Sequence, residues 1–518
     1  MHENRETSAL AGRDERISPA GEGRSQTARM NGVEESDRSI VPVNQPNHAG
    51  TSAAEVGEGR ERIKENASPS HTLSTQREVG VSQGLRGVRE AAKERKRERF
   101  TALLHHLTVD LLRESFYALR RQAAPGVDGV TWREYENGLE DRLTDLHSRV
   151  HRGAYRAQPS RRVYIPKADG RRRPLGIASL EDKIVQQAVV TMLNAIYEVD
   201  FKGFSYGFRP GRSPHQALDA LNVGICRRRV NWILDADIRG FFDNMSHEWT
   251  EKFVQHRVAD LRILRLIHKW LKAGVSEEGE WSETKVGTPQ GAVISPLLAN
   301  IYLHYAFDQW MEAWRKRWAK GEVIVVRYAD DLVVGFEQRE DAEQFLSAFR
   351  ERLAKFGLEV HPEKTRLIEF GRYAAENREK RGEGKPETFD FLGFTHYCGC
   401  KKKRFIVWRK TAGKRMRAKL QQLKQELRRR KHEPLAQVGE WLGSVQRGYY
   451  QYHAVPGNSA TLGRFRHRLF WLWWKLVGRR SDRRMRWDRY CSIFDRWVPY
   501  PRILHPYPSV RFDAMHPR

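Results

Sequence analysis

Two adjacent carboxylates interrupt an apolar stretch near residue 330. Asp330 and Asp331 stand between the β-branched runs Val323 to Val326 and Leu332 to Val334. Two such runs separated by a tight turn predict a pair of antiparallel strands. Acids at a hairpin turn are ordinary, but two carboxylates in an apolar setting are costly to ionise unless a cation neutralises them. The feature therefore predicts a hairpin and makes its turn a candidate metal site.

A second acidic strand end strengthens the metal interpretation. The apolar run that begins at Trp232 ends in Asp237, which offers a third carboxylate. Three carboxylates from different strands can hold two Mg²⁺ ions about 3.5–4 Å apart, which would activate a 3′-hydroxyl and stabilise a leaving pyrophosphate. Asp235 and Asp243 lie in the same stretch, and we interpret them as structural acids.

The positive charge of the chain is concentrated at one end. Residues 401–518 hold 30 Lys and Arg against 7 Asp and Glu, and thus +23 of the net charge of +27. The same tract contains seven of the 15 Trp. A basic tract of this kind favours a polyanion through counterion release, whereas charge spread evenly would indicate solubility alone. We expect a nucleic-acid partner.

Composition also divides the chain. Residues 1–90 contain no aromatic side chain and are rich in Gly, Ser, Glu and Arg, so we expect a disordered extension. Helical patterns begin between residues 91 and 160, then alternate with β-branched runs to about residue 395, which predicts an α+β fold. After residue 400 the pattern is mainly helical. Met416, Leu420, Leu423 and Leu427 form an apolar stripe there, on an otherwise basic helix.

Cysteine content and hydropathy bear on the compartment. Four scattered cysteines do not form a disulfide framework. No run of 18 or more apolar residues is present, and the N-terminus lacks the apolar core of a signal peptide. We expect a cytoplasmic protein with no membrane partner; its oligomeric state does not follow from the sequence.

A series of short blocks, in order over about residues 120 to 395, carries a resemblance to a known family. The blocks are Pro125 to Gly129, Ile165 to Lys167, Arg173 to Ile177, Tyr206 to Ser213, the strand ending at Asp237, Gly287 to Gly291, the Tyr328-Ala329-Asp330-Asp331 turn, Glu363 to Thr365, and Phe391 to Phe394. Each block is a modest pattern, but their shared order is specific. The chain resembles reverse transcriptases.

The resemblance implies a right-hand polymerase with fingers, a palm built on an antiparallel sheet, and a helical thumb. It assigns residues 161–395 to the fingers and palm and residues 396–518 to a basic thumb, also called the maturase or X domain. Asp237, Asp330 and Asp331 match the catalytic metal ligands, and the Ile238 carbonyl is a further candidate oxygen ligand.

Four residues match positions that contact the incoming nucleotide. Lys167 and Arg173 correspond to fingers residues that grip the triphosphate, although a solvated basic loop would have the same composition. Phe242 matches an aromatic position beneath the sugar, where its ring would exclude a 2′-hydroxyl; the alternative is a core aromatic. Gln290 lies in a block that lines the nucleotide pocket. The role of Lys364 stays open.

Within the family, the long basic tract after Phe394 resembles that of group II intron proteins. Arginines interleaved with aromatics suit structured RNA, and the exposed face of the striped helix offers Arg415, Lys419, Arg428, Arg429 and Arg430 as RNA-binding candidates. Trp471, Trp473 and Trp474 lie further along, and we expect at least two of them in the thumb core. No paired Cys and His cluster follows, as in the endonuclease-lacking, class C type.

The expected activity is therefore RNA-directed DNA synthesis with two Mg²⁺ ions, which copies intron RNA during retrohoming, together with help in splicing. The expected partners are intron RNA, a DNA target and primer, and dNTPs. One alternative is a splicing cofactor that binds RNA without polymerase activity. Another is a retron or diversity-generating type of reverse transcriptase.

Overall fold

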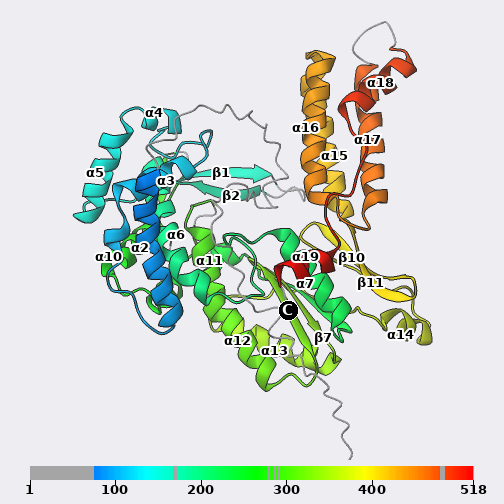
Figure 1. Cartoon of the computed structure of the whole chain (residues 1–518), viewed down its shortest axis with the longest axis horizontal. Helices are drawn as coiled ribbons and strands as arrows, with labels where there is room; N and C mark the ends of the chain where they lie inside the picture. The colour runs from blue at the N-terminus through cyan, green and yellow to red at the C-terminus, as the bar shows by residue number, and fades with distance from the viewer. Residues whose placement is uncertain are drawn as a thin grey trace, which may run out of the picture. The chain divides into compact units, whose positions relative to one another are not determined.

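The computed structural model describes residues 75–166, 172–277, 279–284, 286–288, 291–478 and 485–516. All of them belong to one compact unit, which runs from Gly32 to Arg518. The expected extension lies largely outside the described residues. Where the description begins, helix α2 spans Thr75–Glu94, so the boundary expected at residue 90 falls within a helix. Helices and sheets are mixed throughout, which confirms the α+β class (Figure 1).

The first region combines helices with a small mixed sheet. Its helices are α2, η1 (Leu104–His106), α3 (Val109–Ala118), α4 (Trp132–Glu136), α5 (Leu139–His151) and α6 (Leu180–Asp200), and its strands are β1 (Ser160–Pro166), β2 (Arg172–Ile177), β4 (Val275–Glu277) and β5 (Glu280–Ser282). The strand order is β2-β1-β4-β5. β1 and β2 form an antiparallel hairpin in which Ile165 pairs with Arg173. Of the candidate triphosphate-binding residues, Arg173 belongs to β2 near the end where the two strands are connected, and Lys167 is outside the described residues.

The second region is built on a four-stranded antiparallel sheet. Its elements are α7 (Pro214–Arg227), β3 (Trp232–Asp237), α8 (Phe241–Asn244), α9 (His247–Gln255), α10 (Leu261–Lys272), α11 (Ser295–Leu303), the π-helix η2 (His304–Asp308), α12 (Gln309–Arg317), β6 (Val323–Tyr328), β7 (Asp331–Phe336), α13 (Arg339–Ala354), β8 (Arg366–Glu369) and α14 (Ala374–Lys380). The strand order is β6-β7-β3-β8. Both runs around Asp330 and Asp331 are strands, as the sequence predicts.

Alternating side chains of this sheet enter two different cores. Ile233 and Val333 pack with α7, whereas Leu234 and Val334 pack with α13. Successive side chains of a strand point to opposite faces. Because both faces are covered, the strands consist of continuous apolar runs and do not alternate between apolar and polar residues.

The third region is a short sheet followed by helices. Its strands are β9 (Phe389–Phe391), β10 (Phe394–Lys401) and β11 (Arg404–Thr411), in the order β11-β10-β9, and its helices are α15 (Gly413–Arg429), η3 (Arg430–His432), α16 (Leu435–His453), α17 (Ser459–Val477), α18 (Trp487–Trp497) and α19 (Pro508–Met515). The boundary expected at residue 396 therefore falls inside β10, and helices begin only after Thr411.

The apolar side chains of the third region behave largely as predicted. Met416, Leu420, Leu423 and Leu427 are all buried in one core, which confirms the stripe on α15. Trp473 is fully buried and Trp474 packs against the same core. Trp471, by contrast, is 41% exposed, so two of the three tryptophans belong to the core.

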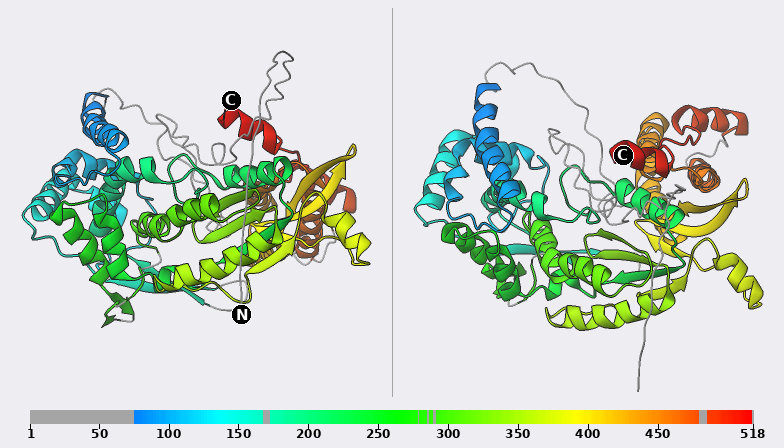
Figure 2. Two further views of the ribbon diagram at one scale, coloured as in Figure 1. Left: turned by 90° about the horizontal axis from the view of Figure 1, so that it is seen from below. Right: turned by 60° about the horizontal axis from the view of Figure 1, so that its bottom comes forward.

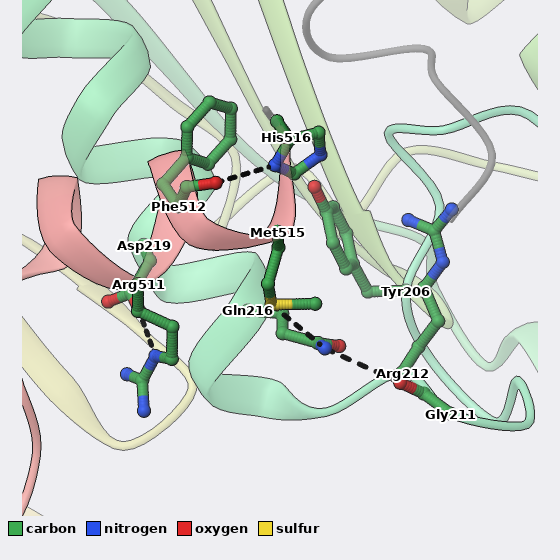
Figure 3. A pocket seen from close by; sticks show the side chains of 9 residues that line it. All are labelled: Tyr206, Gly211, Arg212, Gln216, Asp219, Arg511, Phe512, Met515 and His516. Atoms are coloured by element: carbon green, nitrogen blue, oxygen red, sulfur yellow. Dashed lines mark hydrogen bonds and ion pairs between the residues drawn. The ribbon is translucent and has the colours of Figure 1, made fainter. Parts of the chain in front are cut away.

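The last helix returns to the second region. α19 packs against α7 (Figures 1 and 2), where Arg227 donates to both carboxylate oxygens of Asp513 at 2.8 and 2.6 Å. Arg511 pairs with Asp219, and a small cavity remains beside this contact, lined by Gln216 and Met515 among others (Figure 3). These contacts tie the end of the helical region to α7. None of the described helices is long and apolar enough to cross a membrane.

Candidate active site

The three predicted carboxylates meet at one end of the antiparallel sheet. Asp237, the last residue of β3, lies opposite Asp331, the first residue of β7. Tyr328 pairs with Asp331, which leaves Ala329 and Asp330 as a two-residue loop between β6 and β7. The turn and the second strand end are thus neighbours in space, although more than ninety residues separate them in sequence.

The register also determines which way the acids point. Side chains at alternate positions share a face of a strand, so Asp237 shares a face with Ile233, and Asp331 with Val333. Ile233 and Val333 are covered by the α7 core, whereas Asp331 keeps solvent access at the strand end. The apolar core beneath α7 therefore ends at Ile233 and Val333, and the carboxylates lie beyond it at the end of the strands.

Crowding of these acids perturbs their ionisation. Protein atoms surround Asp331 on the sides away from solvent, and this partial desolvation, with the negative charges of Asp330 and Asp237, raises the pKa of Asp331 to about 7. Burial and, more weakly, Asp390 and Asp237 raise the pKa of Asp235 to about 7, although Arg366 opposes the shift. A cation beside these carboxylates would relieve the repulsion.

The donor set fits Mg²⁺ that is shared with a substrate. Among the described residues, no group of three or more His, Cys, Asp or Glu side chains is placed to hold a metal ion by itself. Mg²⁺ is commonly held by one or two carboxylates and completed by waters and substrate phosphates, so an open set of carboxylates is suitable. The Lys364 ammonium forms an ion pair with the Asp237 carboxylate, so a positive charge already lies beside one of the three acids.

Buried polar side chains form a hydrogen-bond network with the backbone of the turn at Ala329. Arg327, next to Tyr328 on β6, donates to the Ala329 carbonyl at 3.0 Å and to both oxygens of Asp308 at 2.7 and 2.6 Å. Asn300 accepts from Arg327 at 3.1 Å and donates to the Gly207 carbonyl at 2.7 Å. Sequence reasoning missed Arg327, Asp308 and Asn300, because nothing in their spacing indicates that they meet.

Gly207 explains one of the blocks that the sequence singles out. A Cβ added at Gly207 would lie 2.3 Å from the Ala329 nitrogen, so only glycine permits this approach. The backbone on either side of Gly207 is anchored: Tyr206 N donates to the Arg327 carbonyl at 2.8 Å, and the buried Arg209 pairs with Glu198 at 2.9 Å. The block from Tyr206 onwards therefore packs against the turn that carries Ala329 and Asp330.

Phe242 lies among the aromatic side chains at this end of the sheet. Its ring and that of Phe208 are 6.5 Å apart in an edge-on arrangement, and Phe208 is 6.5 Å from Tyr328. Phe242 is partly buried and packs against the larger core. Phe208 thus links the Phe242 ring to Tyr328, and both roles weighed from the sequence remain compatible with Phe242.

The block from Gly287 to Gly291 is held between α8 and β2. Gly287 lies against the Phe242 and Asp243 carbonyls, where a Cβ would meet their oxygens at 2.9 and 2.7 Å. At the other end, a Cβ at Gly291 would lie 2.8 Å from the Gly176 carbonyl oxygen. Gln290 and Lys167 are outside the described residues, and for Arg173 the structure describes the backbone alone. The described contacts are therefore those of Gly287 with α8 and of Gly291 with β2.

The five RNA-binding candidates have different surroundings. Arg415, Arg428 and Arg429 are exposed on α15, and Arg429 is 81% exposed with one ion pair of 3.6 Å to Glu426. Lys419 is half-buried and donates to Gln422 at 3.0 Å. Arg430 pairs with both Glu426 and Glu433 and stacks over Trp441 at 4.7 Å. The exposed candidates remain available to a partner, whereas Arg430 already has protein partners.

This site and sheet define a class of protein. Residues 165–396 match the family model of reverse transcriptase (RNA-dependent DNA polymerase), and this part of the chain is a reverse transcriptase domain with the right-hand polymerase fold. We refer below to the first region as the fingers, the second as the palm and the third as the thumb, which are the parts that the resemblance predicts.

Relatives place the domain more closely. The chain is 38% identical to Protein YkfC of Escherichia coli over 238 residues, which are 40% of this chain and 62% of that protein. It is 36% identical to the group II intron-encoded protein LtrA of Lactococcus lactis over 222 residues, 42% of this chain and 37% of LtrA. A 91 kDa protein in the cob intron of Schizosaccharomyces pombe is 42% identical over 154 residues, 30% of this chain and 19% of that protein. The relatives thus include intron-encoded proteins, and the chain spans less than two thirds of each of these three relatives.

Proposed function

We propose that the protein is the RNA-directed DNA polymerase of a group II intron, and that it copies intron RNA into DNA. The observation that carries the proposal is the register that places Asp237 opposite Asp331, with Asp330 beside them in the turn. The match to reverse transcriptases and the similarity to the intron-encoded protein LtrA support the choice of substrate.

Each part of the site has a proposed task. Asp237, Asp330, Asp331 and the Ile238 carbonyl would hold two Mg²⁺ ions, which supply charge for nucleophile activation and for the leaving pyrophosphate. Lys167 and Arg173, on the β1–β2 hairpin, would bind the triphosphate. Gln290 would line the base and sugar pocket, held there by the anchored glycines on either side of it.

The Phe242 ring would select the sugar. It lies near the catalytic turn and packs against the core on its other side, so it has little room to retreat. A 2′-hydroxyl at that place would clash with the ring, and deoxynucleotides would be preferred over ribonucleotides.

The thumb would bind intron RNA and so assist splicing. Its α15 buries the apolar stripe and leaves Arg415, Arg428 and Arg429 on the exposed face. Cations on such a surface bind phosphates by releasing counterions. Arg430 contributes less to this surface, because its guanidinium is committed to Glu426 and Glu433.

The alternative functions differ in whether they require the three carboxylates of the palm. A splicing cofactor without polymerase activity would gain nothing from three mutually repelling carboxylates, one of which has a pKa raised to about 7. A retron or diversity-generating enzyme would use the same palm, so the palm does not separate it from an intron protein. The long basic thumb favours the intron protein.

Primer extension tests the proposal. Wild type and Asp330→Ala would be compared on an RNA template with Mg²⁺, using dNTPs in one reaction and NTPs in another. We expect DNA synthesis by the wild type alone and with dNTPs alone. Absence of synthesis by the wild type would favour the binding-only cofactor, and equal synthesis by Asp330→Ala would remove this carboxylate from the site.

A further inference from the structure

We propose that Arg327 and Asp308 are positioning residues, which hold the catalytic turn in a conformation that it would not keep unaided. This inference rests on the proposed polymerase function and goes beyond it, because neither side chain faces the substrate. Arg327 is 1% exposed and Asp308 is completely buried. Their contact is bidentate, with both N–H···O distances between 2.6 and 2.7 Å.

The turn needs such support for a conformational reason. Ala329 has a φ of 56°, in the left-handed region that residues with a Cβ rarely adopt and where hairpin turns usually place Gly, Asn or Asp. The Arg327 guanidinium bonds the carbonyl of this same residue at 3.0 Å. Asp330 and Asp331 follow directly, so the conformation of Ala329 determines where both carboxylates point.

The network also connects the turn to its neighbours. Asn300 bridges Arg327 to the Gly207 carbonyl, and Gly207 packs on the Ala329 backbone. One guanidinium therefore links the strand before the turn, the turn carbonyl and two packed segments. The guanidinium donates to four oxygen atoms, two on Asp308 and one each on Asn300 and Ala329.

Asp308 comes from an unusual position in its helix. It is the last residue of the π-helix η2, which joins α11 to α12 without a break. A π-helical turn inserts a residue into an α-helix and shifts the side chains after it, and such turns are frequent at functional sites. Here the shift directs the Asp308 carboxylate to Arg327.

Energetics argue that stability alone is not the reason for this pair. Desolvation of two charges offsets most of their attraction, and apolar residues of similar volume often replace a buried ion pair without loss of stability. The Arg327 guanidinium also donates a hydrogen bond to the Ala329 carbonyl, which an apolar side chain cannot do. The pair should therefore matter more for catalysis than for folding.

The test replaces the pair by apolar residues of similar size. In Arg327→Met with Asp308→Leu, we expect a Tm close to that of the wild type and unchanged affinity for a primer–template duplex. We expect kcat for addition of one nucleotide to fall by about 100-fold, the scale of a small misplacement of catalytic groups, while KM for the dNTP stays within about threefold. Hydrogen exchange at the amides of residues 328–332 should become faster.

Arg257→Met with Asp200→Leu is the matched control. Arg257 is also buried, pairs with Asp200 at 3.1 Å and bonds the carbonyls at the end of α2, including that of Arg95 at 3.1 Å. It supports a helix of the fingers and not the turn. By the same argument, we expect this control to keep a Tm close to that of the wild type, and its kcat should also stay close to that of the wild type.

The outcomes separate the two proposals. A wild type without polymerase activity would overturn the proposed function. An active wild type with a folded double variant of equal kcat and equal exchange would overturn the positioning role. If the double variant does not fold, Arg327→Lys keeps the buried charge but cannot reach Asp308 and the Ala329 carbonyl together; kcat equal to that of the wild type in this variant would also overturn the role.

Discussion

Arg327 and Asp308, which lie behind the turn of Asp330 and Asp331 in the palm, are paired and buried, whereas the charged side chains of the first thumb helix lie mostly on an exposed face. Arg327 and Asp308 make fixed contacts beneath the turn. Arg428 and Arg429 project from α15 above a buried apolar stripe. The difference suggests two uses of charge: precise placement of carboxylates in the palm, and attraction of a flexible polyanion by the thumb.

The largest expected effect is a loss of DNA synthesis when carboxylates of the palm are replaced. Asp237→Asn with Asp331→Asn should reduce DNA synthesis by on the order of 10³-fold or more, as when residues of one catalytic set are removed. Affinity for intron RNA should stay near that of the wild type, because Arg428 and Arg429 lie at the opposite end of α15 from Arg415, whose charge acts on Asp331. Single-turnover primer extension and filter binding measure the two quantities. Loss of RNA affinity in this variant would mean that palm and thumb do not act separately.

A smaller effect comes from steric pressure on the turn. In Gly207→Ala, the new Cβ would lie 2.3 Å from the Ala329 nitrogen, so the turn must move, and we expect a loss of about 100-fold in kcat. Gly463→Ala in α17 is the control, because its Cβ would meet no atom within 4 Å. Rapid-quench incorporation of one dNTP compares them. Similar rates for the two variants would show that the turn tolerates displacement.

The thumb comparison should give a weaker, salt-dependent effect. Arg428→Glu with Arg429→Glu should lower RNA affinity by about tenfold at low salt and reduce the slope of log K against log salt by about 2. Arg430→Gln should affect stability more than this slope, since Arg430 pairs with Glu426 and Glu433. Fluorescence anisotropy over a salt series makes the measurement. An unchanged slope in the double variant would remove this face from the RNA contact.

The smallest effect concerns pH and the stability of the palm. The folded-state pKa of Asp235 is raised to about 7, mainly by burial, above its value in the unfolded chain. Ionised Asp235 therefore costs stability, and the cost is absent below about pH 4 and complete above about pH 7. Asp235→Asn should raise Tm at pH 8 in EDTA and change it little near pH 4. An equal shift at both pH values would point to packing and not to charge.

The sequence predicts the palm better than its support. β-Branched runs and a carboxylate pair indicate the hairpin of β6 and β7, because both signals are local. The Arg327–Asp308 pair has no such signal, since its partners are joined only by the fold. Gly207 has a partial signal, as a glycine within a block, but the residue that it must approach is visible only in the structure.

In the thumb, the sequence predicts the buried side of the first helix better than the ion pairs on its surface. The apolar stripe of α15 follows from helical spacing, and the structure confirms it. Arg428, Arg429 and Arg430 were expected to share one exposed face. Arg430 differs from the other two because it forms ion pairs with Glu426, four residues before it, and with Glu433, three residues after it. The spacing of Glu426 and Arg430 was a usable signal for an ion pair. The sequence does not predict strands β10 and β11, because the turn between them is Lys402-Lys403, which lacks the Gly or Asn typical of a two-residue hairpin turn.

The most direct test of this account is to measure polymerase rate and RNA affinity on the same two variants, Asp330→Ala and Arg428→Glu with Arg429→Glu. The account predicts that the first variant loses DNA synthesis and keeps RNA affinity. It predicts that the second loses RNA affinity with reduced salt dependence, yet adds a single nucleotide to a bound primer–template at close to the wild-type rate. Parallel loss of both properties in both variants would contradict the division of charge between palm and thumb.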